Sequence, residues 1–280
     1  MKNFYFCFSK TINIMKKIIT VLVAAMVSVA AFAQPQVIAH RGYHAIKGSC
    51  RNSIEALKQA QKLGLYGSEC DINMTKDGIL VVAHGSLHPD KIYRKGEDIP
   101  RLNIQKSTYE ELTAIPLENG ETIPTFDQYL KQMKKSKNTK LIIEIKDHAT
   151  PAKETEVVQK VVDMVAQYGL NDMVEYIAFR PWVCFELKRI APEGTPIAYL
   201  NGDYDPAYVK GMGISGIDYK YDVLKKKPKW IKSCQKRGLT VNVWTVNAED
   251  KLRWVIEQGV DYITTDDPVL ANKLIKEMCK

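Results

Sequence analysis

Short apolar segments alternate with amphipathic helical segments along most of the chain, and this alternation constrains the fold more than any other feature. The expected strands cover residues 37–40, 67–74, 79–84, 140–146, 175–179, 196–200, 216–219, 240–246 and 261–265. Helices are expected at 53–63, 125–133 and 152–168, and after Pro181, Pro206, Pro228, Ala248 and Asp267. Alternating β and α units predict a parallel sheet. Eight units over about 250 residues favour an α/β fold of the (β/α)8 TIM barrel type over an open doubly wound sheet.

The first 33 residues are predicted to be a signal peptide, outside the barrel domain at 34–280. Lys16-Lys17 precedes an apolar run that ends in Ala31-Phe32-Ala33, which is the pattern of a cleavable leader. An N-terminal membrane anchor is the alternative, but the run is short for a span. Cleavage would leave Gln34 first. We therefore expect an exported, periplasmic protein with no stable membrane insertion after cleavage.

The charge balance gives no indication of a nucleic-acid partner. The chain carries a net +8, and its first 33 residues hold four lysines and no acid, so residues 34–280 carry a net +4. This mild excess suits weak steering of anionic substrates, and no basic stripe with interleaved aromatics is present. Lys225-Lys226-Lys227 is interpreted as the solvated start of a helix, with a binding patch as the alternative. The five cysteines after residue 33 show neither a disulfide framework nor zinc-site spacing.

The motif Glu69-Cys70-Asp71 and the following His84 suggest a metal site with an acid–base group beside it. On a strand, Glu69 and Asp71 point to one face and Cys70 to the other. Asp77-Gly78 predicts a two-residue hairpin turn, which would place His84 directly opposite Asp71. Two carboxylates and an imidazole would then lie together. A structural ion-pair cluster is the alternative for the two acids.

Further polar residues follow the predicted strands at the end where TIM barrels hold their active sites. Polar residues scattered along the chain by chance would not recur at the same end of successive strands. Trp244 could instead be core packing, and Asp266 could instead cap a helix. The residues are His40, Glu69, Asp71, Glu144, Lys146, Lys220, Trp244 and Asp266.

A series of short motifs extends across residues 34–280, and its order and spacing resemble the glycerophosphodiester phosphodiesterase family. Each motif alone is weak, and the series together is specific. The motifs are Ala39-His40-Arg41-Gly42, Asn52-Ser53, Glu69-Cys70-Asp71, Thr75-Lys76-Asp77-Gly78, Val82-Ala83-His84, Ile123-Pro124-Thr125, Glu144-Ile145-Lys146, Trp244-Thr245-Val246-Asn247 and Thr265-Asp266-Asp267-Pro268.

The resemblance implies a TIM barrel that holds one divalent cation, Ca²⁺ or Mg²⁺. It also implies a small insertion after the second strand, at about 85–122, that shapes the pocket for the alcohol. The site residues would be Glu69, Asp71 and Glu144 for the metal, His40 and His84 for acid–base catalysis, and Arg41, Lys146, Trp244 and Lys220 for phosphate and substrate.

These residue types fit the cleavage of a phosphodiester. A hard cation held by carboxylates neutralises the non-bridging oxygens, and Arg41 can bind phosphate in a bidentate fork. One imidazole can take the nucleophile's proton while the other protonates the leaving alkoxide. The resemblance further implies attack by a substrate hydroxyl and a cyclic phosphate that water opens. The expected products are sn-glycerol 3-phosphate and an alcohol.

Two positions depart from the family pattern and bear on the substrate. Arg51 stands where the family usually has a glutamate, and Gly85 follows His84 where the family usually has an aspartate. The added positive charge suits a more anionic or larger substrate, and Arg180 points the same way. Two alternatives stay open: a phospholipase-like or sugar-phosphodiester hydrolase on the same barrel, and a non-catalytic binding protein.

Overall fold

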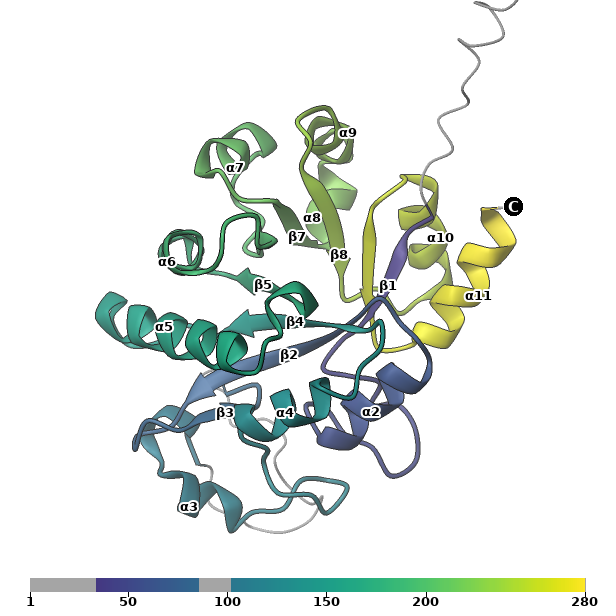
Figure 1. Cartoon of the computed structure of the whole chain (residues 1–280). Helices are drawn as coiled ribbons and strands as arrows, with labels where there is room; N and C mark the ends of the chain where they lie inside the picture. The colour runs from purple at the N-terminus through teal and green to yellow at the C-terminus, as the bar shows by residue number, and fades with distance from the viewer. Residues whose placement is uncertain (1–33, 86–101, 280) are drawn as a thin grey trace, which may run out of the picture. The chain divides into compact units, whose positions relative to one another are not determined.

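Eight parallel strands close into a barrel in the computed structural model, which describes residues 34–85 and 102–279 (Figure 1). The strands are β1 (Gln36–Ala39), β2 (Gly67–Met74), β4 (Lys140–Ile145), β5 (Val174–Ala178), β6 (Ile197–Tyr199), β7 (Gly216–Lys220), β8 (Thr240–Trp244) and β9 (Tyr262–Thr265). Each pairs in parallel with the next, and β1 pairs with both β9 and β2, which closes the ring. The predicted TIM barrel is confirmed. Gln34–Lys280 forms one compact unit.

Helices cover the outside of the barrel, and local sequence sets their ends (Figure 1). Ser53, Thr125 and Asp267 accept a backbone N–H of the first turn as N-caps, and four of the helices begin with proline. The helices are α2 (Ile54–Lys62), α4 (Phe126–Met133), α5 (Pro151–Gln167), α6 (Pro181–Ile190), α7 (Pro206–Met212), α8 (Tyr221–Lys226), α9 (Lys229–Lys236), α10 (Glu249–Glu257) and α11 (Pro268–Met278).

The structure has two helices, α8 and α9, where the sequence predicted one helix starting at Pro228. Pro228 disfavours helical backbone at the preceding residue, and Lys227 has φ −126° and ψ 54°. The helix therefore breaks between Lys226 and Lys229. Lys225-Lys226-Lys227 lies at the end of α8, so its interpretation as a helix start was wrong.

Alternate strand residues build two apolar layers. Outward-facing residues such as Cys70 and Ile143 pack against the helices, whereas Ile38, Ile142 and Ile177 pack together inside the barrel. Burying each aliphatic side chain contributes about 1.5–3 kcal/mol. The inside of the barrel therefore combines apolar side chains with buried polar ones such as Asp218 and Asn242, and further polar side chains gather at the strand ends. No two of the described cysteines are bonded to each other.

The hairpin after β2 has a different register from the predicted one. β3 (Leu80–Val82) pairs antiparallel with β2, with Ile72 opposite Val82. The turn holds three residues between Thr75 and Ile79, and Gly78 adopts φ 83° in it. The third turn residue shifts the pairing by one position. Ala83, whose N–H donates to the carbonyl oxygen of Asp71, lies opposite Asp71, so the prediction that placed His84 there was wrong.

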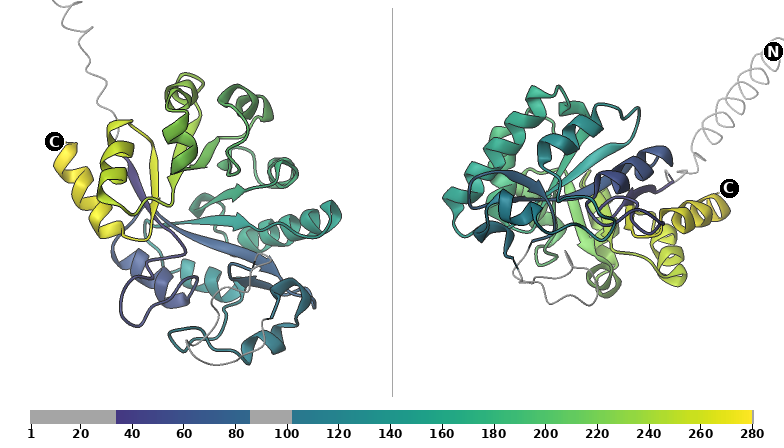
Figure 2. Two further views of the ribbon diagram at one scale, coloured as in Figure 1. Left: turned by 180° about the vertical axis from the view of Figure 1, so that it is seen from behind. Right: turned by 90° about the horizontal axis from the view of Figure 1, so that it is seen from below.

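The insertion after β3 has a small core of its own and lies to one side of the barrel (Figure 2). It contains η1 (Ile104–Lys106) and α3 (Tyr109–Thr113), and its core joins Val81, Ala83, Ile104, Leu112 and Ile123. A Cβ on Gly85 would lie 2.4 Å from Ile104 Cδ1, so an aspartate there would require Ile104 to move.

Two predicted segments lie outside the described residues: the proposed leader at 1–33 and positions 86–101 of the predicted insertion. Within the part of the chain that the structure describes, no helix has the length and apolar character needed to cross a bilayer.

Candidate active site

Three carboxylates meet at the C-terminal end of the barrel. Glu69 and Asp71 project inward from β2, and Glu144 projects inward from β4, where it is the register neighbour of Asp71. All three are buried, and one oxygen of each lies within 4.8 Å of the others. Calcium–oxygen bonds of about 2.3–2.6 Å allow a single ion to reach oxygens about 5 Å apart. The predicted metal ligands are therefore brought together.

The electrostatics of these carboxylates also fit a cation. Burial, and then the charges of Asp71 and Glu144, raise the pKa of Glu69 well above its usual value. Burial likewise raises the pKa of Glu144 to about 7, although Lys146 opposes it. Oε1 of Glu69 is buried and has no hydrogen-bond partner among the described residues. Because such an oxygen is costly without a partner, the residues present fit a divalent cation.

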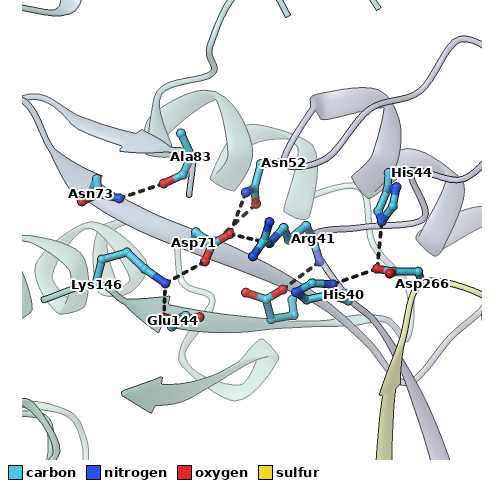
Figure 3. A network of polar contacts seen from close by, with 11 residues as sticks. His40, Arg41, His44, Asn52, Asp71, Asn73, Ala83, Glu144, Lys146 and Asp266 are labelled. Carbon is cyan, nitrogen blue, oxygen red and sulfur yellow. Dashed lines mark hydrogen bonds and ion pairs between the residues drawn. The ribbon is translucent and has the colours of Figure 1, made fainter. Parts of the chain in front are cut away.

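Lys146, which directly follows β4, balances part of this negative charge (Figure 3). Its Nζ lies 2.5 Å from Oε1 of Glu144 and 3.3 Å from Oδ1 of Asp71. Burial acts to lower the pKa of Lys146, but the two carboxylates outweigh burial and raise it. Burial also acts to raise the pKa of Asp71, yet Lys146 and Arg41 hold that pKa below its usual value. Asp71 and Lys146 therefore stay charged.

Arg41 orients two of the carboxylates from an unusual backbone conformation. Its φ of 55° aims the backbone N–H at Oε2 of Glu69, 2.7 Å away. Its Nε lies 3.2 Å from Oδ2 of Asp71. A left-handed conformation costs a non-glycine residue about 1–3 kcal/mol. Gly42 then has φ 76°, and a Cβ there would lie 2.6 Å from the Cβ of Ala56, so the motif requires glycine.

Asn52 holds Asp71 from the other side, and sequence reasoning did not assign it this role. Its φ is 60°, its Nδ2 donates to Oδ2 of Asp71 at 2.7 Å, and its Oδ1 accepts the N–H of Asp71 at 3.3 Å. The only sequence signal was its place in a motif just before Ser53, the N-cap of α2. Asn52 thus fixes the plane of the Asp71 carboxylate.

His40 ends up in a network centred on Asp266 (Figure 3). Oδ1 of Asp266 lies 2.8 Å from Nδ1 of His40 and 3.0 Å from Nε2 of His44, while Oδ2 accepts a hydrogen bond from Asn247 at 2.8 Å. Although burial opposes it, hydrogen bonding to the two histidines holds the pKa of Asp266 far below its usual value. The N-cap of α11 is Asp267, so the alternative that made Asp266 a helix cap was wrong.

Two cavities meet at His40, Arg41 and His84. The inner cavity has a volume of about 80 Å³ and reaches Glu69, Glu144, Lys146 and an apolar wall formed by Phe179 and Trp244. These two rings pack edge to face with centroids 5.7 Å apart. The outer cavity has a volume of about 300 Å³ and is lined by Arg51, Asn52, Leu117 and Glu118, among others. A diester phosphorus held between the two cavities would have one space for each substituent.

His84 lines both cavities. Burial lowers the pKa of His84 to about 4, against the opposing charge of Asp71. Burial likewise lowers the pKa of His40, although Asp266 acts in the opposite direction. Both imidazoles are therefore neutral at pH 7 before an anionic ligand arrives.

The comparisons with known proteins agree with this geometry. The model of the glycerophosphoryl diester phosphodiesterase family matches residues 40–270. The chain belongs to this family. Its members are phosphoric diester hydrolases, and the resemblance found in the sequence motifs is confirmed.

Individual relatives match over nearly their full length. A glycerophosphodiester phosphodiesterase from Caldanaerobacter subterraneus subsp. tengcongensis is 28% identical over 251 residues, which are 86% of this chain and 98% of the relative. The crystal structure of a glycerophosphodiester phosphodiesterase from Parabacteroides distasonis is 40% identical, with a TM-score of 0.81 over 88% of this chain and 99% of that one. A phosphodiesterase from Oleispira antarctica, solved with sn-glycerol-3-phosphate, shares the fold at 21% identity and a TM-score of 0.71, over 87% of this chain and 97% of that one.

Within this glycerophosphoryl diester phosphodiesterase chain, two cations with a predicted role toward the substrate lie elsewhere: Lys220, predicted to bind phosphate or substrate, and Arg180, expected to favour an anionic substrate. Lys220 is exposed and lines neither cavity. Nε of Arg180 lies 3.1 Å from Oε1 of Glu154, so its charge is already paired. Arg51 does line the outer cavity. Of the two cations linked to a more anionic substrate, Arg51 is thus the one that lines the site.

Proposed function

We propose that the protein is a metal-dependent hydrolase of glycerophosphodiesters that releases sn-glycerol 3-phosphate and an alcohol. The observation that carries the proposal is the cluster of Glu69, Asp71 and Glu144, with His40 and His84 beside it where two cavities meet. The family membership and the sn-glycerol-3-phosphate bound to the Oleispira antarctica phosphodiesterase support it.

The phosphate would be held by positive charge on several sides. A divalent cation bound by the three carboxylates would supply Lewis-acid stabilisation of the phosphate oxygens. Arg41 contacts Asp71 through Nε, which leaves its terminal nitrogens available for a phosphate fork. Lys146 adds a buried ammonium at the inner cavity.

His40 is the better candidate for the general base. Ionised Asp266 accepts but cannot donate a hydrogen bond, so the proton of neutral His40 lies on Nδ1 and leaves Nε2 free to take the nucleophile's proton. The carboxylate then stabilises the imidazolium that forms. His84 would protonate the leaving alkoxide, because the bound phosphate anion raises the pKa of an adjacent imidazole. The roles would reverse when water opens a cyclic phosphate.

The outer cavity suits a small polar alcohol. Arg51 and Glu118 carry opposite charges at its lining, beside a short apolar surface that includes Leu117. A phospholipase acting on acyl chains would need a wider apolar mouth, so this lining supports the glycerophosphodiester over the phospholipase-like alternative. Arg51 further supports a preference for alcohols that bear a negative charge.

The deciding experiment is an assay of glycerophosphocholine and bis-p-nitrophenyl phosphate hydrolysis. We expect activity that a chelator abolishes and that Ca²⁺ or Mg²⁺ restores, with sn-glycerol 3-phosphate as the product from the first substrate. Turnover that survives the chelator would contradict the metal role. Metal binding without turnover of either diester would favour the binding-protein alternative.

Export to the periplasm is part of the same proposal and rests on the leader pattern at residues 1–33. The mass of the protein isolated from its native cell envelope would test it. Cleavage after Ala33 predicts a chain that begins at Gln34, whereas an intact N-terminus would support a membrane anchor.

A further inference from the structure

The positive charge of the protein is concentrated in one segment, residues 220–237, which includes α8 and α9. This segment has one carboxylate, Asp222, so its net charge is +7, and the remainder of residues 34–280 carries a net −3. We call its cations the basic surface: Lys220, Lys225, Lys226, Lys227, Lys229, Lys232, Lys236 and Arg237.

The side chains of the basic surface are exposed and lack acidic partners. All eight are solvent-exposed, and none of them forms an ion pair with another residue that the structure describes. Exposed lysines elsewhere do form such pairs, as Lys131 does with Asp127 and Lys153 with Glu156. Concentrated positive charge without local neutralisation attracts a polyanionic partner.

On α9 the cations form one stripe. Lys229, Lys232 and Lys236 fall within about 60° around the helix axis at 3.6 residues per turn. The stripe lies opposite Ile231 and Cys234, which are buried against the barrel. The helix therefore presents three ammonium groups together on its outer side.

Half-buried aromatic rings lie among these lysines, so the expectation that the chain has no basic stripe with interleaved aromatics was wrong. Nζ of Lys227 lies 3.9 Å from the ring centroid of Trp230, and Nζ of Lys225 lies 4.4 Å from that of Trp254. Both indole rings are partly exposed. Aromatic rings with one apolar and one wet side, next to lysines, are typical of protein surfaces that lie at lipid headgroups.

We propose that the basic surface docks the protein on the anionic face of a phospholipid bilayer. Seven of its eight cations are lysines, whose compact charges suit a fluid layer of headgroups, whereas nucleic-acid recognition relies on planar arginine forks. Lys220 ends β7 as the register neighbour of Trp244, which lines the inner cavity. Docking through this surface holds the cavities near a membrane. The proposal concerns binding and does not depend on the proposed catalytic function.

Vesicle co-sedimentation tests this directly with residues 34–280, the compact unit that contains every described strand and helix. We expect binding to phosphatidylcholine vesicles containing one third phosphatidylglycerol, and little binding to phosphatidylcholine alone. Binding should weaken with salt, since the Debye length falls from about 10 Å at 0.1 M to about 3 Å at 1 M.

The decisive variant combines Lys229→Gln, Lys232→Gln and Lys236→Gln. Each lysine near an anionic surface multiplies partitioning about fivefold, so we expect a loss of roughly 100-fold. The matched control combines Lys62→Gln, Lys135→Gln and Lys137→Gln, which removes the same charge from exposed positions outside the basic surface. Equal Tm values for the parent, the α9 variant and the control variant would show that all three proteins are folded, without reference to activity.

Three outcomes would overturn the proposal. The first is equal weakening in the control and the α9 variant, which would mean a general charge effect. The second is unchanged binding by the α9 variant. The third is displacement of the protein from anionic vesicles by a short DNA duplex, when DNA phosphate and anionic lipid are present at the same concentration. That result would favour a nucleic-acid partner. Strong loss in the α9 variant alone supports the lipid surface.

Discussion

Nδ1 of His40 donates a hydrogen bond to Oδ1 of Asp266 over 2.8 Å. The two residues are 226 positions apart in the chain, and the closing of β9 against β1 brings them together. Because a carboxylate only accepts hydrogen bonds, this contact sets the tautomer of neutral His40. Asp266 thus acts as a positioning residue for the proposed base.

Replacing Asp266 with Asn should lower kcat by roughly 10²–10⁴ and leave KM nearly unchanged, because an amide can favour the wrong tautomer of His40. Loss of the carboxylate also removes an interaction that raises the pKa of His40, so the acidic limb of the kcat profile should move to lower pH. Rates measured across the pH range check both effects. Asp267→Asn is the control, since Asp267 caps α11. An unchanged pH profile with reduced stability would leave Asp266 a merely structural role.

His40→Asn and His84→Asn should each lower kcat on glycerophosphocholine by roughly 10²–10⁴ while preserving metal binding. The p-nitrophenolate group leaves without help from an acid. If His84 is the acid, its variant should recover much of its rate on bis-p-nitrophenyl phosphate, and the His40 variant should not. Parallel kinetics on both diesters give the result. The reverse pattern would exchange the two roles.

The sequence predicted most of the barrel, because its strands are buried and bounded by turn residues. β2 has the predicted limits Gly67–Met74, and all of its residues are buried. The rule that active sites lie at strand ends also selected Glu69, Asp71 and Glu144, which the structure brings together. These features follow from local pattern and from the symmetry of the barrel.

Other features depended on information that local pattern does not hold. The hairpin register depended on a third turn residue, and one residue more or less reverses which side chains share a face. The contacts of Asn52 with Asp71 and of His44 with Asp266 join segments distant in the chain. Their residue types are common in loops, so only the folded structure reveals them.

Asp218 should make stability depend on pH. It is fully buried on β7, and burial, followed by the charge of Glu144, raises its pKa to about 8. The folded state therefore keeps the proton that the unfolded chain releases above pH 4, so stability falls as the pH rises from about 4 to 8. By pH 7 the free energy of unfolding is expected to fall by about 4 kcal/mol. Asp218→Asn should flatten this decline, as measured by urea unfolding of chelated protein at several pH values.

Exposed Asp222 provides the matched control for this experiment. Asp222→Asn should leave the pH dependence of the parent protein intact. If Asp218→Asn shows the same slope as the parent, burial does not perturb Asp218 as the structure indicates.

Glu69→Gln should abolish divalent-cation binding and yet stabilise the metal-free protein. The amide removes a charge that Asp71 and Glu144 repel, while its oxygen can still accept the N–H of Arg41. A gain of about 1 kcal/mol in the free energy of unfolding corresponds to a rise of about 2–4 °C in Tm for a domain of this size. Calorimetric titration with Ca²⁺ and thermal unfolding with chelator measure the two effects. Glu175→Gln, a buried carboxylate paired with Lys140, should retain binding; loss of binding there too would remove the special role of Glu69.

Arg51→Ala should alter the choice of alcohol. Arg51 lines the outer cavity, so its loss should reduce kcat/KM for glycerophosphoserine more than for glycerophosphocholine. We expect a ratio change of about 2–5-fold, because Arg51 is exposed and exposed ion pairs contribute only about 0.2–1 kcal/mol. Lys47→Ala removes a cation that lines neither cavity and should leave the ratio unchanged. An equal effect of Arg51→Ala on both diesters would exclude Arg51 from alcohol selection.

His40 and His84 are attached to the protein by different means. His40 follows β1 on the closed barrel, whereas His84 follows β3, which lies outside the ring and pairs there with the edge of β2 and with the segment before α4. The insertion therefore continues from the strand that precedes the proposed acid, whereas the proposed metal ligands lie on β2 and β4 of the ring. We expect that its length and shape can be exchanged, in evolution or by design, to change which alcohol departs, while the barrel separately controls the geometry of the proposed cation site.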